Sequence, residues 1–213
     1  MDEQLIQALT DLDEEAVLRR VRDRLDANDD PQAILAACRE GLARVGQRFE
    51  RGEYFVSELI MAGEVFKQVI AELGPLSTTG QGATRGAIVF GTVKSDIHDI
   101  GKDLVIGMLR AAGFDVTDLG IDVPPERFVA AVRETGAKVV GLSGLLTVAF
   151  DSMKATVSAL DAAGLRPGAK VMIGGGLVNE AVRAHASADA FGTDPQQAVD
   201  LANRWYAEAE GQS

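Results

Sequence analysis

The sequence has little cysteine and histidine, with one cysteine and two histidines in 213 residues. The lone Cys38 excludes an internal disulfide and a zinc or iron–sulfur site built from several cysteines. Its place on an apolar stripe with helical spacing predicts a buried structural thiol. No apolar run approaches the roughly 20 residues of a membrane span. The acidic start, Met1-Asp2-Glu3, lacks the pattern of a signal peptide, so we expect a cytoplasmic protein.

Positive charge is also scarce, because 21 basic residues stand against 32 acidic ones and the formal net charge is −11. This balance disfavours sequence-independent binding to nucleic acid phosphates and to anionic membranes, so we expect neither as a partner. Apolar side chains make up 46% of the chain, which is enough to bury a substantial core.

Two common nucleotide-binding motifs are missing after the first predicted strand. The absence of Gly-x-x-x-x-Gly-Lys-Ser/Thr disfavours a phosphate loop, and the absence of Gly-x-Gly-x-x-Gly disfavours a dinucleotide site. Catalytic zinc needs three protein ligands, whereas we find one histidine with adjacent carboxylates. One imidazole suits a metal whose equatorial positions are already filled by other ligands. The second histidine, His185, belongs to no constellation and is assigned no role.

The chain divides into two parts with different hydrophobic periods. In the first part the apolar residues recur at helical spacing, and Asp30-Pro31 supplies a cap and a first-turn proline for one helix. Gly74-Pro75 ends the last of these helices, and a polar stretch follows. We therefore predict a helical bundle over residues 1–75, a linker over 76–85 and a second domain over 86–213.

The second domain alternates apolar strands with helices, which predicts a parallel sheet covered on both faces. Strands are predicted at Gly86–Gly91, Phe114–Leu119, Lys138–Leu142, Ala169–Ile173 and Ala188–Phe191. Helices are predicted at about Ile100–Ala112, Pro125–Thr135, Ala149–Ala163, Asn179–His185 and Pro195–Glu208. The expected fold is thus a helical bundle followed by a doubly wound, flavodoxin-like α/β domain. In the strand order 2-1-3-4-5, the first, third and fourth strands are neighbours and their carboxyl ends share one edge.

One histidine, His98, lies in a loop flanked by carboxylates, within Ser95-Asp96-Ile97-His98-Asp99-Ile100-Gly101-Lys102. The loop joins a strand to a helix, which is where ligands bind in open α/β sheets. A neutral imidazole there can ligate a metal, although a histidine beside an aspartate is also common as a hydrogen-bonded structural residue. Ser143 follows the third strand, and Gly174 and Gly175 follow the fourth. The three motifs converge on one edge, where small residues and a hydroxyl suit a flat, nitrogen-bearing group.

The motif Asp96-x-His98-x-x-Gly101, followed by Ser143-x-Leu145 and Gly174-Gly175, resembles the cobalamin-binding domain of corrinoid methyl-transfer proteins. The similarity to cobalamin-dependent methionine synthase extends through Thr92-Val93-Lys94. The stretch from Gly46 to Val56 resembles the helical cap that precedes this domain in those proteins, so the resemblance covers nearly the whole chain. It implies cobalamin or a related corrinoid as cofactor, in its methylcobalamin and Co(I) forms.

The resemblance also implies roles for individual residues. His98 would be the lower axial ligand of cobalt, and Asp96 would accept the other ring proton of His98 and fix its tautomer. Ser143 would meet the buried nitrogen of the displaced nucleotide base. Methionine synthase has a serine that extends the relay beyond the aspartate, but this chain has Ala149, so water or Asp99 would have to substitute. The implied cofactor contacts further include Asp99, Ile100, Gly101, Leu145, Thr147, Gly174 and Gly175.

Three residues of the cap match positions that shield the upper, methyl-bearing face of the corrinoid in the family. They are Phe49, Val56 and Leu59. Their periodicity alone favours the ordinary core of a helical bundle over a cofactor contact.

By this resemblance the chain is a methyl carrier that moves a methyl group on cobalt between a substrate-specific methyltransferase and an acceptor methyltransferase. A reductive activating protein would be a further partner, and the chain would be a subunit of a methyltransferase system, not an autonomous enzyme. A cobalamin-dependent sensor or regulator is the main alternative, although such proteins usually append a DNA-binding helix-turn-helix. The cobalamin subunit of a mutase would generally lack the cap. A metal-free signalling domain would leave the clustered motifs unexplained.

Overall fold

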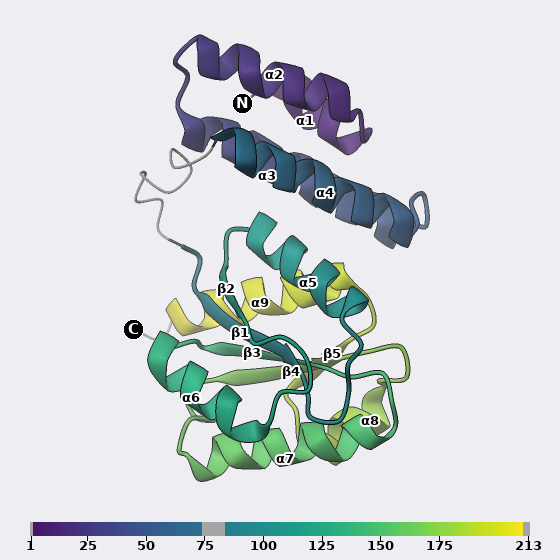
Figure 1. The fold of residues 1–213 in the computed structure, drawn as a ribbon, viewed down its shortest axis with the longest axis vertical. Helices are drawn as coiled ribbons and strands as arrows, with labels where there is room; N and C mark the ends of the chain where they lie inside the picture. The colour runs from purple at the N-terminus through teal and green to yellow at the C-terminus, as the bar shows by residue number, and fades with distance from the viewer. Residues whose placement is uncertain (1, 74–83, 211–213) are drawn as a thin grey trace. The chain divides into compact units, whose positions relative to one another are not determined.

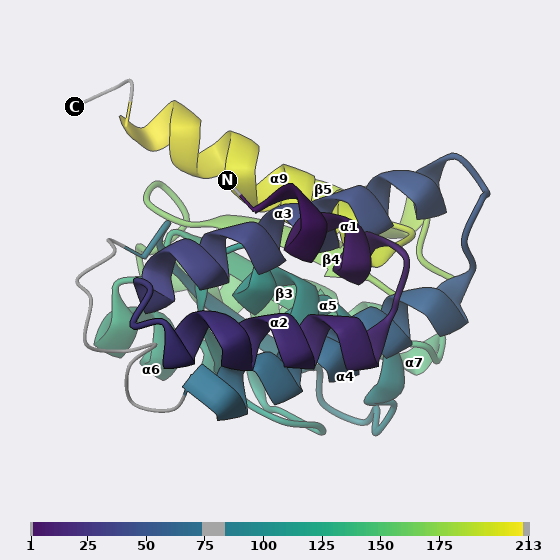
Figure 2. The ribbon, with the colours of Figure 1, turned by 90° about the horizontal axis from the view of Figure 1, so that it is seen from above.

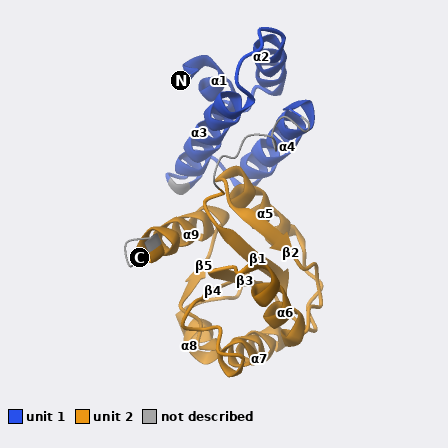
Figure 3. Cartoon of the chain, turned by 90° about the vertical axis from the view of Figure 1, so that its left-hand side faces the viewer, with its two compact units in different colours: residues 1–83 blue, residues 84–213 orange. Residues whose placement is uncertain are grey.

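The computed structural model describes residues 2–73 and 84–210, which belong to two compact units, residues 1–83 and residues 84–213 (Figures 1 and 3). Of the predicted linker over 76–85, all but the last two residues lie outside the described residues. Within the described ranges, no helix is both long enough and apolar enough to cross a bilayer.

The first unit is built from helices that pack side by side. They are α1 (Glu3–Thr10), α2 (Glu14–Asp26), α3 (Pro31–Glu50) and α4 (Val56–Leu73). Helices α1 and α4 each pack against both α2 and α3, which closes the arrangement (Figure 2). The N-terminus of α3 has the predicted cap, because the Asp30 carboxylate accepts a hydrogen bond of 3.0 Å from the Gln32 N–H and Pro31 occupies the first turn. The predicted helical bundle is confirmed.

The core of this bundle contains the single cysteine. Cys38 lies on α3 among Ile34, Leu42 and Val45, all of which are buried. Burial raises the pKa of the Cys38 thiol to about 12, because a thiolate is poorly solvated among apolar side chains. The thiol is therefore a packing group, as the sequence predicts.

The second unit is a five-stranded, entirely parallel sheet in the order β2-β1-β3-β4-β5 (Figure 1). Its strands are β1 (Ala87–Thr92), β2 (Asp115–Asp118), β3 (Val139–Ser143), β4 (Lys170–Gly174) and β5 (Ala190–Gly192). Its helices are α5 (Ile100–Ala111), α6 (Pro125–Thr135), α7 (Val148–Ala162), α8 (Glu180–Ala186) and α9 (Pro195–Glu210). The predicted flavodoxin-like fold is confirmed, and each predicted end lies within two residues of the observed one.

The sheet is covered on both faces, and the alternation along β1 shows how. Ile88 and Phe90 belong to the apolar core that includes residues of α5 and α9, whereas Val89 belongs to the core that includes residues of α6, α7 and α8. Figure 1 shows these two groups of helices on opposite faces of the sheet. All three side chains are buried, so β1 has no solvent-facing side. This double coverage explains why the strand sequences are continuous apolar runs.

The register of the sheet sets the position of the candidate site. Thr92 at the end of β1 pairs with Ser143 at the end of β3, and Ser143 pairs with Gly174 at the end of β4. The three neighbouring strands therefore end level with one another, and the loops that follow them share one edge of the sheet.

Candidate functional site

A buried carboxylate organises the loop that carries the candidate ligand. The Asp96 side chain is fully buried, and its Oδ2 accepts hydrogen bonds from the backbone N–H groups of Leu145 (2.7 Å) and Leu146 (3.0 Å). Its Oδ1 accepts a hydrogen bond of 3.0 Å from the His98 backbone N–H and lies 2.7 Å from the His98 ring Nδ1. Asp96 thus joins the loop after β1 to the loop after β3 and holds the His98 ring at the same time.

The hydrogen bonds keep this carboxylate charged. Burial raises the pKa of Asp96, but the N–H groups of Leu146, His98 and Leu145 and the His98 ring outweigh burial and leave the pKa at about 2. A charged carboxylate can only accept hydrogen bonds, so Nδ1 of His98 must carry the hydrogen. The other ring nitrogen, Nε2, is then the one with a free lone pair in the neutral imidazole.

The His98 ring lies at the surface of this edge, with 47% of its side chain exposed, although its backbone is anchored. The hydroxyl of Thr92, which is fully buried at the end of β1, donates a hydrogen bond of 2.8 Å to the His98 carbonyl oxygen. In the first turn of α5, a Cβ on Gly101 would meet no atom within 4 Å beyond its chain neighbours and the backbone of its own helix. Contacts within the described residues therefore do not require glycine at position 101, and the open space leaves room for a ligand to approach the backbone.

The loops after β3 and β4 touch each other directly. A Cβ on Gly175 would lie 1.9 Å from the Gly144 carbonyl oxygen, and Gly175 has a φ of 148° that favours glycine. The contact with Gly144 and the positive φ therefore require glycine at position 175. The resemblance implies another reason for this glycine, namely room for the nucleotide of the corrinoid. At Gly174 a Cβ would make only an ordinary contact, 3.5 Å from the Gly192 carbonyl oxygen.

The remaining predicted contacts of this unit have few partners of their own. Ser143 is half-buried, and its hydroxyl makes no hydrogen bond within the described part of the chain. Thr147 and Asp99 are exposed and flank the starts of α7 and α5, where neither side chain caps its helix. Ala149 is fully buried. Asp99, the predicted substitute for a serine in the relay, makes no hydrogen bond to His98 among the contacts of the described residues.

Exposed apolar side chains gather at this same edge of the sheet. Every large hydrophobic side chain that is exposed in the described part of the second unit lies in a loop or first helical turn after β1, β2, β3 or β4. These residues are Ile97, Ile100, Ile121, Leu145, Leu146, Val148 and Leu177. Of these residues, Ile100 and Leu145 are among the predicted cofactor contacts. Exposed apolar groups concentrated at one edge indicate a binding surface for a large, partly apolar partner.

A buried lysine fastens the helix after the histidine loop to the neighbouring strand. Lys102 in α5 is 3% exposed, and its Nζ lies 2.8 Å from Asp118 Oδ2 at the end of β2 and 2.5 Å from Asp103 Oδ1. Burial lowers the pKa of Lys102, but the two carboxylates outweigh burial and leave the pKa raised. Sequence reasoning missed this group, since the charge pairing depends on contacts between α5 and β2.

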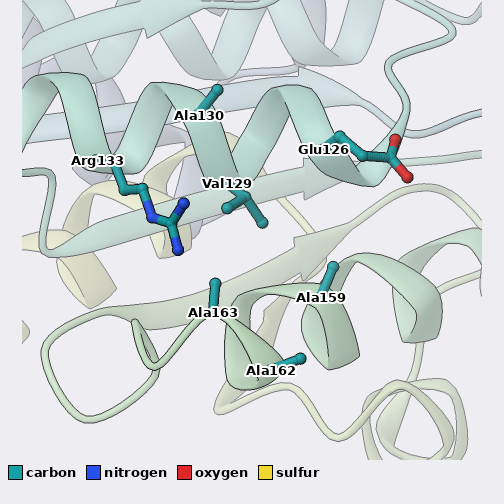
Figure 4. Close-up of a pocket in the computed structure, with 7 residues that line it drawn as sticks. All are labelled: Glu126, Val129, Ala130, Arg133, Ala159, Ala162 and Ala163. Carbon is teal, nitrogen blue, oxygen red and sulfur yellow. The ribbon is translucent and has the colours of Figure 1, made fainter.

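Two other features lie apart from these residues. Among the described residues, no cluster of three or more histidine, cysteine, aspartate or glutamate side chains could hold a metal ion. A groove of about 500 Å³ lies between α6 and α7, and Figure 4 shows its lining, with Glu126 and Arg133 on α6 and small side chains on both helices. None of the predicted site residues lines this groove.

The predicted cap residues differ in exposure within the first unit. Leu59 is 2% exposed and belongs to the interior of the bundle, Phe49 is half-buried, and Val56 at the start of α4 is 50% exposed. The exposed apolar group around Val56 also includes Phe55, Ile60 and Met61, which the sequence analysis did not select.

Two family models match the chain. A model described as a B12 binding domain matches residues 86–200, and a second model with the same description matches residues 1–73. The dimethylamine corrinoid protein of Methanosarcina barkeri is 36% identical over 193 residues, which cover 90% of this chain and 89% of that protein.

Solved structures support the same relationship. A cobalamin-binding protein from Desulfitobacterium hafniense DCB-2 is 43% identical with a TM-score of 0.78, covering 94% of this chain and 96% of that one. The methanol:cobalamin methyltransferase complex MtaBC from Methanosarcina barkeri contains a chain that is 26% identical, with a TM-score of 0.81 and coverage of 97% and 80%. The similarity to methionine synthase is by comparison a loose analogy. The chain belongs to the B12-binding corrinoid proteins.

Proposed function

We propose that this chain is a corrinoid-binding methyl carrier, in which His98 is the lower axial ligand of cobalt. The observation that carries the proposal is the fixed imidazole: the buried Asp96 carboxylate occupies Nδ1 of His98 and leaves Nε2 as the free donor at the edge of the sheet. A bound corrinoid supplies a cobalt centre that accepts a methyl group and passes it on.

The residues present fit such a group. A corrinoid needs one axial donor from the protein because its ring supplies the equatorial nitrogens. The loops after β1, β3 and β4 offer one imidazole, that of His98, and the described residues contain no cluster of three or more metal-ligating side chains. The exposed apolar side chains around it, among them Ile97, Ile100 and Leu145, suit the edge of a macrocycle. We propose that the open backbone at Gly101 and the hydroxyl of Ser143 receive the ring edge and the nucleotide tail, together with Asp99, Thr147, Gly174 and Gly175.

In this proposal the protein contributes orientation and control of one proton. Asp96 holds the hydrogen at Nδ1 of His98, which keeps Nε2 basic and aimed outward. Because Asp96 is itself held by Leu145 and Leu146, the imidazole is in place before a cofactor arrives.

We further propose that partner proteins determine the substrate. The relatives include one named for dimethylamine, and a similar chain belongs to a complex named for methanol. Substrate-specific methyltransferases would therefore dock on a common corrinoid carrier, an acceptor methyltransferase would take the methyl group, and a reductive activating protein would restore the cofactor. A cytoplasmic location remains part of this proposal.

The functional domains are proposed as a helical cap over 1–75, a linker over 76–85 and a cobalamin-binding domain over 86–213. The two family models, which cover residues 1–73 and 86–200, support this division. Exposed apolar residues at the start of α4, with Val56 among them, are proposed to shield the upper face of the corrinoid. Phe49 remains a predicted contact, whereas the burial of Leu59 favours a role in the bundle core.

The proposal is tested by identifying the axial nitrogen. The protein is grown with ¹⁵N-histidine, loaded with hydroxocobalamin and reduced to the Co(II) form for electron paramagnetic resonance. A histidine ligand changes the nitrogen splitting from a triplet to a doublet, because ¹⁵N has spin one-half, whereas the unlabelled base of the corrinoid keeps the triplet.

The matched variants are His98→Ala and His185→Ala. We expect the doublet to disappear in His98→Ala and to persist in His185→Ala, since His185 is the other histidine and bonds instead to exposed Asp151. A triplet in the labelled parent protein would overturn the assignment of His98 as the ligand.

A further inference from the structure

The loop after β2 continues the sheet pairing alongside the histidine loop. Thr92 donates its backbone N–H to the Gly120 carbonyl oxygen (2.9 Å), and Val123 donates its N–H to the Thr92 carbonyl oxygen (3.0 Å). A parallel bridge between Val93 and Val123 extends this pairing beyond the named strands. The segment from Gly120 to Val123 therefore lies directly beside the start of the histidine loop.

Two residues in left-handed conformations face each other across this junction. Ser95 has a φ of 67° and Asp122 a φ of 52°. The left-handed region is unfavourable for serine and better tolerated by aspartate, so Ser95 needs something to hold it there. Two hydrogen bonds hold Ser95 in this conformation. The Ser95 N–H donates a hydrogen bond of 2.7 Å to Asp122 Oδ1, and the Asp122 N–H donates one of 3.0 Å to the Asp96 carbonyl oxygen.

The turn at Ser95 determines the direction of the residues that follow it. The Asp96 N–H donates back to the Val93 carbonyl oxygen (3.2 Å), which closes the turn with Ser95 inside it. The next groups along the chain are the Asp96 carboxylate and the His98 ring, only 2.7 Å apart. A change in the backbone at Ser95 would swing Asp96 away from the N–H groups of Leu145 and Leu146 and release the ring.

We propose that Asp122 is a positioning residue for His98: its carboxylate holds Ser95 in the left-handed conformation and thereby aims the imidazole at the cofactor. Asp122 lies outside the motif Asp96-x-His98-x-x-Gly101 and belongs to a different loop, 24 positions after His98 in the chain. The inference rests on the proposed assignment of His98 as the cobalt ligand.

The test compares Asp122→Gly with Asp122→Asn. Glycine adopts a φ of 52° without strain, so Asp122→Gly removes the hydrogen-bond acceptor without forcing the backbone out of the left-handed region. Asparagine keeps an acceptor oxygen at the same distance and tolerates the left-handed region. The readout is the ratio of histidine-coordinated to uncoordinated cobalt in the ¹⁵N-histidine Co(II) spectrum, with cooperative thermal unfolding of each apoprotein as the check on folding.

We expect Asp122→Gly to lower that ratio about 10-fold, the size of effect seen when a supporting residue of a metal ligand is removed. We expect Asp122→Asn to restore it to within a few-fold of the parent. A parent-like ratio in Asp122→Gly would overturn the proposal, and so would an Asp122→Asn variant as impaired as Asp122→Gly. If Asp122→Gly does not unfold cooperatively, Asp122→Ala, which also lacks a side-chain acceptor, replaces it under the same criteria.

The His98→Ala protein separates this proposal from the proposed function. If the labelled parent shows no histidine doublet, or shows one that persists in His98→Ala, the assignment of His98 as the cobalt ligand has failed. If it does show one and Asp122→Gly leaves it unchanged, only the role of Asp122 has failed.

Discussion

The molecule contains two histidine–aspartate pairs with nearly the same bond length and very different surroundings. His98 Nδ1 lies 2.7 Å from Asp96 Oδ1, and His185 Nε2 lies 2.8 Å from Asp151 Oδ1. The Asp96 side chain is fully buried and held by backbone N–H groups on two loops, whereas the Asp151 side chain is 86% exposed. The difference shows that a carboxylate with a fixed position distinguishes the candidate ligand, since the histidine–aspartate contact itself occurs in both places.

The largest expected effect comes from changing Asp96, the buried aspartate of the two pairs, to asparagine. In Asp96→Asn, either orientation of the amide points an NH₂ group at backbone N–H donors, so hydrogen bonds are lost in the buried site. We expect corrinoid affinity to fall 10- to 100-fold and the free energy of unfolding to fall by about 1–3 kcal/mol. The measurements are cobalamin titration and denaturant unfolding.

The matched control for that experiment is Asp151→Asn. Its carboxylate is exposed, so we expect corrinoid affinity to be unchanged and the stability change to stay within about 0.5 kcal/mol. Equal losses in the two variants would remove the distinction between the pairs.

The charge on the Asp96 carboxylate should also make the stability of the protein depend on pH. The pKa of Asp96 is lowered from 3.8 to about 2, so the charged carboxylate contributes stability that is present above about pH 4 and is lost as the pH falls toward 2. The free energy of unfolding of the parent should therefore fall by about 2 kcal/mol more than that of Asp96→Asn between about pH 5 and about pH 2. Parallel pH profiles for the two proteins in urea unfolding would contradict this expectation.

The smallest effects should separate two neighbouring hydroxyls at the ends of β1 and β3. Thr92→Val removes a buried hydrogen bond to the His98 carbonyl oxygen and should cost about 1 kcal/mol of stability. Ser143→Ala removes a hydroxyl without a partner in the described protein, so stability should hold while corrinoid affinity falls by roughly 2- to 10-fold. Loss of stability without loss of affinity in Ser143→Ala would argue against its predicted contact with the nucleotide base.

The fold could be predicted from the sequence because its strands and helices follow local hydrophobic patterns. The apolar runs of β1, β3 and β4 and the helical stripes between them predicted alternating strands and helices. The flavodoxin-like strand order expected for such a domain then placed His98, Ser143 and Gly174 on one edge, and the structure has that order. The cap of α3 at Asp30 was equally visible, since its partners lie within a few residues.

The supporting contacts of the site could not be predicted in the same way. Asp96 bonds to the N–H of Leu146, 50 positions later, and Asp122 bonds to Ser95 across two loops. No periodicity encodes such pairs, because they depend on how the loops meet at the end of the sheet. The helical pattern of α4 also did not distinguish buried Leu59 from exposed Val56, because both positions carry apolar side chains.

The bond between Asp96 and the loop after β3 has a consequence for transplanting this site into another protein. A graft of residues 92–101 alone would carry the histidine but not the backbone donors at 145 and 146 that hold its aspartate. In such a host the Asp96 carboxylate would still contact the His98 ring, but it would lose the two N–H donors that fix its own position. A graft that keeps all the contacts described here needs β1, β2 and β3 together with the loops that follow them, because Asp122 holds Ser95 from the loop after β2 and Leu145 and Leu146 hold Asp96 from the loop after β3.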